Sequence, residues 1–103
     1  MPPATYEVQI SPEAKADMNR LYDYIAFDCF QRDTADKYLY GIQSKIDKLA
    51  WIGGSIGISL NRNLQRQYGY GVRTITYKKM TIIYNVENNC ILVRRIKPGK
   101  NII

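Results

Sequence analysis

The stretch that decides the fold is VRTITYKKMTIIYNVENNCILVRRIK, residues 72–97. It holds three runs rich in β-branched and aromatic residues, which predict strands at 72–77, 80–86 and 90–97. Lys78-Lys79 and Glu87-Asn88-Asn89 separate these runs, and asparagine tolerates the left-handed backbone of a tight turn. This part of the chain therefore predicts three consecutive strands in a mainly antiparallel sheet.

Side chains alternate between the two faces along a strand, so the residues of the last run can be divided by parity. Ile91, Val93, Arg95 and Lys97 share one parity, whereas Arg94 has the other. We therefore expect Arg94 and Arg95 on opposite faces, and the face that carries Arg95 is not purely polar.

Two amphipathic helices are predicted upstream of these strands. The first begins at Ser11-Pro12, where serine can cap free N–H groups and proline suits the first helical position, and it runs to about Asp28. The second is capped by Asp33 or Thr34 and stops at Gly53-Gly54. The short connection predicts an antiparallel hairpin. Apolar residues at helical spacing form one stripe on each helix, namely Ala14, Met18, Leu21, Ile25 and Cys29 on the first and Ala35, Leu39, Ile42, Ile46 and Leu49 on the second.

The remaining segments complete the predicted topology. Residues 6–10 alternate in polarity and predict a first strand, whereas residues 53–71 are expected to form a loop with some apolar anchors. The order β-α-α-β-β-β predicts an α+β fold, in which a helical hairpin packs on a mainly antiparallel four-stranded sheet. Because the chain has 103 residues, we expect a single domain over residues 1–103.

Positive charge is concentrated in the second half of the chain, which has a formal net charge of +6 overall. Residues 1–52 contain 6 Lys and Arg and 8 Asp and Glu, whereas residues 53–103 contain 9 Lys and Arg and a single acidic residue, Glu87. The sheet half therefore predicts a basic face suited to phosphates or to an acidic protein partner, although surplus lysines also serve solubility.

The composition excludes several classes of function. The chain has no histidine, which removes Ser-His-Asp and Cys-His nucleophile activation and, with 2 cysteines, leaves too few ligands for a structural zinc site. Cys29 and Cys90 lie among apolar neighbours and are expected to be buried free thiols. Asp17, Asp23 and Asp28 are expected to form a solvated polar face. We expect no cofactor and no metal. Because no apolar run approaches the length of a membrane span, we also expect no membrane partner and a cytoplasmic location.

Basic residues and tyrosines interleave in the sheet half. Such a mixture can hold RNA through phosphate contacts and base stacking, whereas tyrosines in strands more often pack and hydrogen-bond at their tips. A nuclease without histidine would use Lys or Arg to stabilise the transition state and Tyr, Asp or Glu to move a proton. Since Glu87 is the single carboxylate of this half, the paired carboxylates of a two-metal nuclease are missing there.

Several runs, taken in their order and spacing, resemble the RelE/ParE superfamily of bacterial type II toxins. They cover nearly the whole chain, and they are Tyr6-x-Val8-x-Ile10-Ser11-Pro12-x-Ala14, Leu21-Tyr22-Asp23-Tyr24-Ile25, Gly71-Val72-Arg73, Met80-x-Ile82-Ile83-Tyr84-x-Val86 and Ile91-x-Val93-x-Arg95-Ile96-x-x-Gly99-Lys100.

The resemblance implies a small basic toxin of a plasmid-stabilising addiction module, which inhibits bacterial growth until a cognate antitoxin wraps it through helix-in-groove or added-strand contacts. RelE-like members cut mRNA on the ribosome with basic residues and a C-terminal tyrosine. ParE-like members inhibit DNA gyrase and lack that catalytic set. A homodimer and a toxin–antitoxin hetero-oligomer are both compatible with the resemblance.

The sequence departs from the RelE pattern at its catalytic positions. Thr76 and Asn101 stand where RelE-like toxins have arginine, and Pro98 stands where many relatives have histidine. The C-terminal tyrosine has no counterpart before the last residue, Ile103. These departures favour ParE-like inhibition of gyrase, with ribosome-dependent mRNA cleavage as the alternative.

Three sets of candidate site residues follow from the charge pattern and the resemblance. If the chain is an mRNA nuclease, its catalytic candidates are Arg73, Arg95, Lys100 and Tyr84. The target-binding candidates are the basic residues Arg62, Arg66, Arg73, Lys78, Lys79, Arg95, Lys97 and Lys100. The antitoxin-binding candidates are apolar residues of the first helix and the C-terminus, namely Met18, Leu21, Tyr22, Ile25, Ile102 and Ile103.

Overall fold

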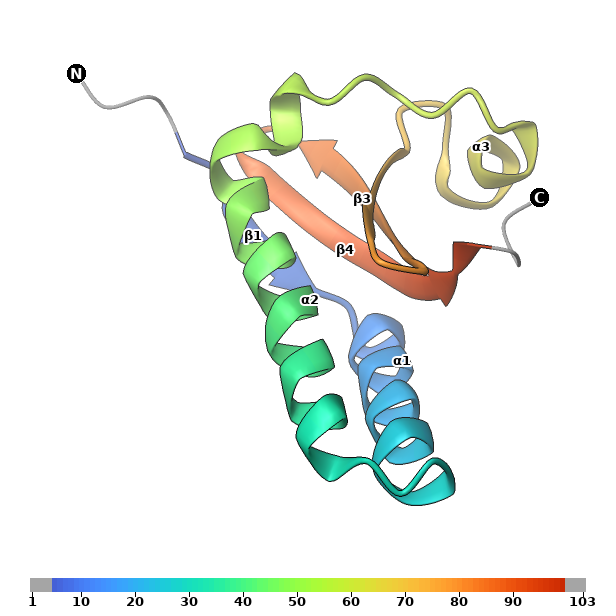
Figure 1. The fold of residues 1–103 in the computed structure, drawn as a ribbon. Coiled ribbons are helices and arrows are strands. Elements are labelled where there is room, and N and C mark those ends of the chain that lie inside the picture. The colour runs from blue at the N-terminus through green and yellow to red at the C-terminus, as the bar shows by residue number, and fades with distance from the viewer. Residues whose placement is uncertain (1–4, 100–103) are drawn as a thin grey trace.

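A sheet and a helical hairpin form the body of the protein, for which the computed structural model describes residues 5–99 (Figure 1). The order confirms the predicted β-α-α-β-β-β α+β class and adds one short helix. The elements are β1 (Glu7–Ile10), α1 (Pro12–Asp23), η1 (Tyr24–Asp28), α2 (Arg32–Ile52), η2 (Gly53–Ser55), α3 (Arg62–Tyr68), β2 (Arg73–Tyr77), β3 (Met80–Glu87) and β4 (Cys90–Pro98).

The sheet has the strand order β1-β4-β3-β2. β1 pairs with β4 in parallel, and the β2–β3 and β3–β4 pairs are antiparallel. The predicted turns at 78–79 and 87–89 join the antiparallel strands. Lys78 and Asn88 adopt the left-handed backbone there, with φ angles of 52° and 54°. Tight hairpins favour such positive φ angles because their twist matches that of the flanking strands.

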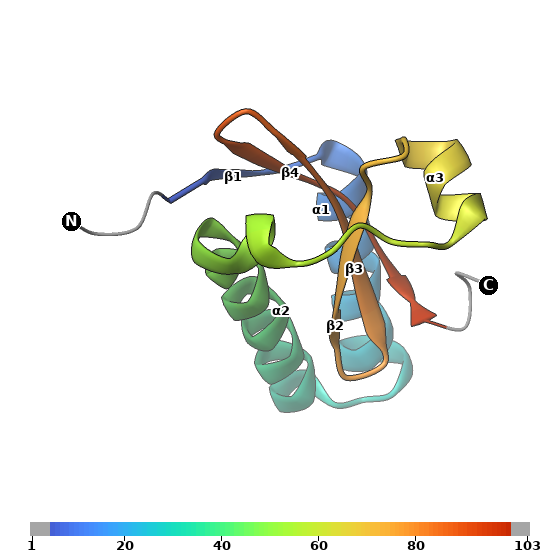
Figure 2. The ribbon, with the colours of Figure 1, turned by 90° about the horizontal axis from the view of Figure 1, so that it is seen from above.

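The two faces of the sheet are covered differently. α1 and α2 pack on one face, and α3 lies on the other side of the sheet (Figure 2). Ile82 and Ile83 of β3 illustrate the alternation, because Ile82 belongs to the main core under the helical hairpin and Ile83 to a smaller cluster with Leu64 and Val72. The buried residues of the main core are Ala14, Met18, Ile42, Ile46, Leu49, Met80, Ile82, Tyr84, Ile91, Val93 and Ile96.

A β-bulge in β4 changes the face that its last residues occupy. Tyr84 pairs with Val93 and Ile83 pairs with Arg95, so Arg94 is the extra residue. An extra residue reverses the parity of everything that follows it. Val93 and Ile96 therefore both reach the main core, although they are three positions apart. The prediction that Arg95 shares a face with Val93 is wrong for this reason.

The first helix extends to Asp28 as predicted, but its last five residues form the π-helix η1. Cys29 N–H donates to the Tyr24 carbonyl, five residues back, at 3.0 Å. This wider turn takes later residues off the apolar stripe. Cys29 is consequently exposed and Cys90 is half-buried, so the prediction of two buried thiols is wrong.

The second helix starts slightly earlier than predicted. α2 begins at Arg32, Gln31 precedes it without a side-chain cap, and Asp33 lies inside the first turn. The expected cap at Asp33 or Thr34 is therefore wrong, whereas Ala35, Ile42, Ile46 and Leu49 are buried as expected. No helix within residues 5–99 combines the length and apolarity needed to cross a membrane.

The segment predicted as a loop at 53–71 contains the helix α3. Asn61 caps it, because its side-chain oxygen accepts from the N–H groups of Asn63 and Leu64 at 2.9 and 3.1 Å. Leu64 is the buried residue of this short helix. An Asn cap and one buried leucine leave little periodicity in the sequence, so the helix depends on its packing against Val72 and Ile83.

Candidate functional site

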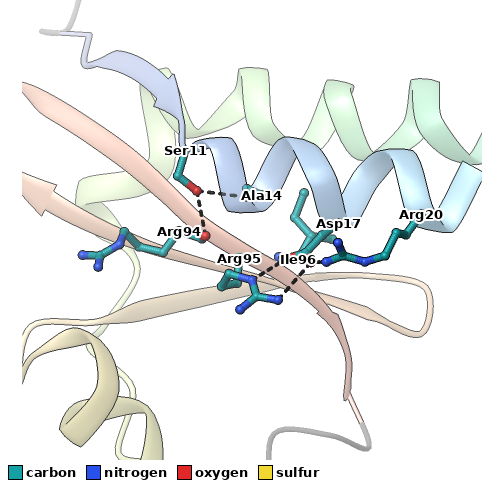
Figure 3. A network of polar contacts seen from close by, with 7 residues as sticks. All are labelled: Ser11, Ala14, Asp17, Arg20, Arg94, Arg95 and Ile96. Atoms are coloured by element: carbon teal, nitrogen blue, oxygen red, sulfur yellow. Dashed lines mark hydrogen bonds and ion pairs between the residues drawn. The ribbon is translucent and has the colours of Figure 1, made fainter.

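Beyond the end of β1, the residue that precedes α1 forms hydrogen bonds with the edge of β4. β1 pairs with β4 up to Ile10, which lies opposite Val93. Ser11 N–H then donates to the Val93 carbonyl at 2.9 Å, and Ser11 Oγ donates to the Arg94 carbonyl at 2.8 Å. The same hydroxyl accepts from Ala14 N–H at 3.0 Å (Figure 3). Ser11 thus caps the helix as predicted and also extends the edge contacts beyond the strand.

One turn further along α1, the Asp17 carboxylate holds the next part of β4. Its Oδ2 accepts from Arg95 Nε at 2.8 Å and from Ile96 N–H at 3.0 Å, and its Oδ1 accepts from Arg95 Nη2 at 3.0 Å. Arg20 forms a second ion pair with the same carboxylate (Figure 3). We call Asp17, Arg20, Arg95 and the Ile96 N–H the α1–β4 clamp. A bidentate arginine contact supported by a backbone donor is a strong arrangement for a carboxylate.

The surroundings of Asp17 correct the expectation of a solvated carboxylate. The residue is 7% exposed. Burial by itself raises the pKa of Asp17, but hydrogen bonds from Arg95 and from the Ile96 N–H, with the charges of both arginines, bring the pKa below its usual value. The same hydrogen bond raises the pKa of Arg95. Both groups therefore stay charged in the clamp.

A second polar cluster connects the middle of β3 with the end of α2. The Gly53 carbonyl accepts from Tyr84 Oη at 2.9 Å and from Arg73 Nη1 at 3.2 Å. Arg73 and Tyr84 face each other across β2 and β3. The Arg73 Nε is buried and has no hydrogen-bond partner within residues 5–99. We call these three residues the Gly53 cluster.

The nuclease candidates therefore do not form one site, because Arg73 and Tyr84 belong to the Gly53 cluster and Arg95 belongs to the α1–β4 clamp. Tyr84 is fully buried, and burial raises the pKa of its hydroxyl to about 12. Its hydroxyl is thus directed at Gly53 inside the protein, which weighs against a role in moving a proton on RNA. Arg95 is engaged by Asp17, and Arg73 by Gly53. Lys100 lies outside the described residues.

The target-binding candidates do not form one patch. Arg62 and Arg66 are exposed on α3. Lys78 and Lys79 are exposed at the β2–β3 turn, where Lys78 Nζ lies 5.4 Å from the centre of the Tyr38 ring. The turn borders a hollow of about 580 Å³ whose lining includes Thr76, Lys78, Lys79, Met80, Thr81, Pro98 and Gly99. The basic residues thus gather at α3 and at the Met80–Pro98 end of the sheet.

The antitoxin-binding candidates are divided by burial. Met18 belongs to the core, so its prediction as a contact residue conflicts with its 8% exposure. Leu21, Tyr22 and Ile25 are half-buried. A hydrogen bond to Asp36 raises the pKa of Tyr22 and links α1 with α2. Ile102 and Ile103 lie outside the described residues.

Leu21 lines a groove of about 430 Å³ between α1 and the ends of β3 and β4. The groove was not predicted, because its sides come from residues 17–24, 80 and 95–98. Arg20 could have been noticed through its i, i+3 spacing from Asp17. Nothing local in the sequence marks Met80 or Pro98 as its neighbours. We call this the α1–β4 groove, lined by Asp17, Arg20, Leu21, Tyr24, Met80, Arg95, Ile96, Lys97 and Pro98.

Comparison with known families adds the decisive observation. The model of the family described as "ParE toxin of type II toxin-antitoxin system, parDE" matches residues 8–103. The chain belongs to the ParE toxin family. It is thus a toxin of the type II toxin–antitoxin class, and the ParE-like branch favoured by the sequence is confirmed. None of the curated protein sequences compared with this ParE-family chain matches it.

Solved structures show the same fold. The chromosomal ParDE toxin–antitoxin system from P. aeruginosa contains a chain with a TM-score of 0.72 and 21% identity, and the match covers 92% of this chain and 97% of that one. The toxin–antitoxin complex RelBE2 from Mycobacterium tuberculosis gives a TM-score of 0.54 and 14% identity, covering 91% of this chain and 98% of that one. At these identities the likeness concerns the fold alone.

Proposed function

We propose that this ParE-family chain acts as a single toxin domain over residues 1–103, that a cognate antitoxin neutralises it, and that the free toxin stops bacterial growth by binding DNA gyrase. Family membership supports the toxin role. The two structural relatives are a ParDE system and a RelBE2 complex, both toxin–antitoxin assemblies, which supports an antitoxin as partner here.

The observation that carries the choice of gyrase is the engagement of the nuclease candidates inside the protein. A nuclease without histidine needs cations free to stabilise a phosphorane and a group able to move a proton. In this chain, Arg95 pairs with Asp17, Arg73 donates to Gly53, and the Tyr84 hydroxyl is buried. Each of these side chains contributes to packing, which favours a toxin that acts through protein contact.

The proposal is tested by expressing the chain alone and together with the adjacent reading frame. We expect growth arrest on induction, loss of negative supercoiling in a reporter plasmid, intact messages, and relief of the arrest by the neighbouring protein. Purified toxin should inhibit supercoiling by purified gyrase. Cleavage of ribosome-bound message with normal supercoiling would instead identify a RelE-like nuclease and overturn the gyrase assignment.

The candidate residues sharpen the same test. In a gyrase inhibitor, Tyr84→Phe should inhibit purified gyrase as well as the wild type, because the buried hydroxyl contributes only to stability. In a nuclease that uses this hydroxyl, the same change would abolish cleavage in a protein that remains folded. Circular dichroism and the midpoint of urea unfolding confirm the folded state of both proteins.

A further inference from the structure

The end of the helical hairpin carries two exposed phenylalanines. We call residues 26–34 the hairpin tip, and Figure 1 shows the connection between η1 and α2 projecting beyond the sheet. Phe30 is 89% exposed and Phe27 is 50% exposed. Large aromatic side chains on an open surface are typical of a contact with a protein partner. They border a hollow of about 760 Å³ that is lined by Ala26, Phe27, Phe30, Gln31, Arg32, Asp33 and Thr34.

Phe30 has a backbone conformation that favours glycine. Its φ angle is 56°, and the next N–H, that of Gln31, donates to the Ile25 carbonyl six residues back at 3.0 Å. Helices commonly end in this way, with glycine as the left-handed residue because it has no Cβ. A bulky residue costs conformational energy in this place, and the exposed ring recovers little of it by packing inside the protein. We therefore expect the Phe30 ring to act through a partner.

The charge of the hairpin tip is opposite to that of the sheet half. Residues 23–36 contain four aspartates, all of them exposed, and a single basic residue, Arg32. The Arg32 guanidinium lies 5.4 Å from the centre of the Phe27 ring, which attracts the cation. Residues 53–86, by contrast, contain neither Asp nor Glu. Electrostatic complementarity therefore favours a basic partner surface at the tip, because an acidic one would be repelled there.

The tip is separate from the candidate antitoxin contacts. Leu21 and Tyr22 lie on α1 and do not line the hollow, whereas Phe27 and Phe30 lie within and beyond the π-helix η1. The other partner in the proposed function is gyrase, which works on DNA. A protein that holds DNA neutralises phosphates with basic residues, so it presents basic surfaces. The acidic tip therefore fits the chemistry of the target.

We propose that the hairpin tip is the surface through which this toxin contacts gyrase. The Phe30 ring enters an apolar pocket of the enzyme, and Asp28 and Asp33 pair with basic residues at the rim of that pocket. This inference rests on the proposed function, because gyrase is the target. It goes further by placing the contact on the acidic half, away from the basic target-binding candidates, and by naming the chemistry of the partner surface.

The first experiment measures the toxin concentration that halves supercoiling by purified gyrase. Phe30→Gly should raise this concentration about tenfold or more, since buried aromatic anchors carry a large share of interface energy. Its midpoint of urea unfolding should equal or exceed that of the wild type, because glycine suits the positive φ angle. Leu60→Gly is the control, since Leu60 is 84% exposed and does not line the hollow. Its inhibition should stay within about twofold of the wild type.

The charge of the tip is tested by a second matched pair. Asp33→Lys should also weaken inhibition about tenfold, because it places like charges together in the contact. Asp47→Lys is the control, since Asp47 is exposed on α2, does not line the hollow and undergoes the same charge change. Its inhibition should stay within about twofold of the wild type. Circular dichroism establishes that all four variants fold like the wild type.

A photo-crosslinking amino acid in place of Phe30 identifies the contact directly, and we expect it to capture a basic segment of a gyrase subunit. If the wild type does not inhibit gyrase, the proposed function fails, and this inference fails with it. If the wild type inhibits gyrase but Phe30→Gly and Asp33→Lys inhibit it equally well, the inference alone is overturned. A crosslink to the antitoxin or to a second toxin copy instead of gyrase also overturns it.

Discussion

Two arginines that the sequence marks as equivalent candidates lie in very different surroundings. Arg95 belongs to the α1–β4 clamp, where a buried carboxylate neutralises it. Arg73 belongs to the Gly53 cluster, where it donates to a carbonyl and its Nε has no partner within residues 5–99. The clamp is an ionic connection between a helix and a strand, whereas the cluster is organised by a neutral acceptor. The comparison shows that residue type alone does not reveal which cation is available to a partner.

The largest effect is expected from removing the carboxylate of the clamp. Asp17→Ala leaves Arg95 and the Ile96 N–H without their acceptor and should lower the free energy of unfolding by about 3 kcal/mol. This lies at the low end for a broken buried pair, because the Arg95 side chain is 30% exposed and can recover water. Urea denaturation measures the change. Asp23→Ala, at an exposed position at the end of α1, should change stability by less than about 0.5 kcal/mol.

A smaller effect is expected where the Gly53 cluster meets the sheet. A Cβ added to Gly53 would lie 2.2 Å from Ile91 Cδ1, so the Ile91 side chain would have to move. Gly53→Ala should therefore cost about 2 kcal/mol through overpacking. Gly57→Ala is the control, because nothing lies within 4 Å of a Cβ there. Equal stabilities of the two variants would show that α2 does not approach β4 this closely.

The Tyr84 hydroxyl of the Gly53 cluster should contribute still less to the free energy of unfolding. Tyr84→Phe removes the 2.9 Å hydrogen bond to Gly53 and should lower the free energy of unfolding by about 1 kcal/mol. Arg73 can still donate to the same carbonyl, which limits the loss. A loss as large as that of Asp17→Ala would contradict the distinction between a cluster built on a neutral acceptor and an ionic clamp.

The smallest differences concern pH, and they have opposite signs in the two regions. The folded pKa of Asp17 is below the ordinary aspartate value of 3.8, so its contribution to stability is present above that pH and is lost as the pH falls through the folded pKa. The wild type should therefore lose more stability than Asp17→Asn between about pH 5 and pH 2. Parallel acid titrations of the two proteins would contradict the lowered pKa.

Tyr84 should instead affect the pH dependence of stability at alkaline pH. Its folded pKa is about 12, above the ordinary tyrosine value of 10.0, so its contribution to stability is complete below pH 10 and is lost as the pH rises toward 12. Urea midpoints measured from pH 9 upward should fall more steeply for the wild type than for Tyr84→Phe. Asp17→Asn should follow the wild type in this range, which separates the two regions within one experiment.

Much of the fold could be predicted because its signals are local. Ser11-Pro12 starts α1, the stripe from Ile42 to Leu49 is buried, and both predicted turns join antiparallel strands. The π-turn before Cys29 and the helix capped by Asn61 escaped prediction. The π-turn is a single wider turn, and the short helix has one buried leucine, so neither leaves a hydrophobic periodicity that can be recognised in the sequence.

The candidate site was less predictable, because its contacts join distant parts of the chain. The basic half and the ParE resemblance were visible in the sequence, and the family match supports the resemblance. The groove was not visible, since Leu21 meets Met80 and Pro98 only after the sheet has formed. Arg95 was selected for its charge, but its ion pair with Asp17 spans 78 positions.

The sequence by itself determined the order of the strands and of the two long helices and the α+β class, because caps, hydrophobic periodicity and turn residues act within a few neighbours. The family was indicated separately, by the resemblance of several motifs to known toxins. Tertiary structure alone decided which charges are available. The bulge at Arg94 reverses the parity of β4 and turns Arg95 off the core face, and the end of β1 leaves a strand edge for Asp17 to satisfy. A buried backbone N–H needs a hydrogen-bond acceptor, which can come from a residue far away in the sequence, and no local pattern encodes which residue provides it.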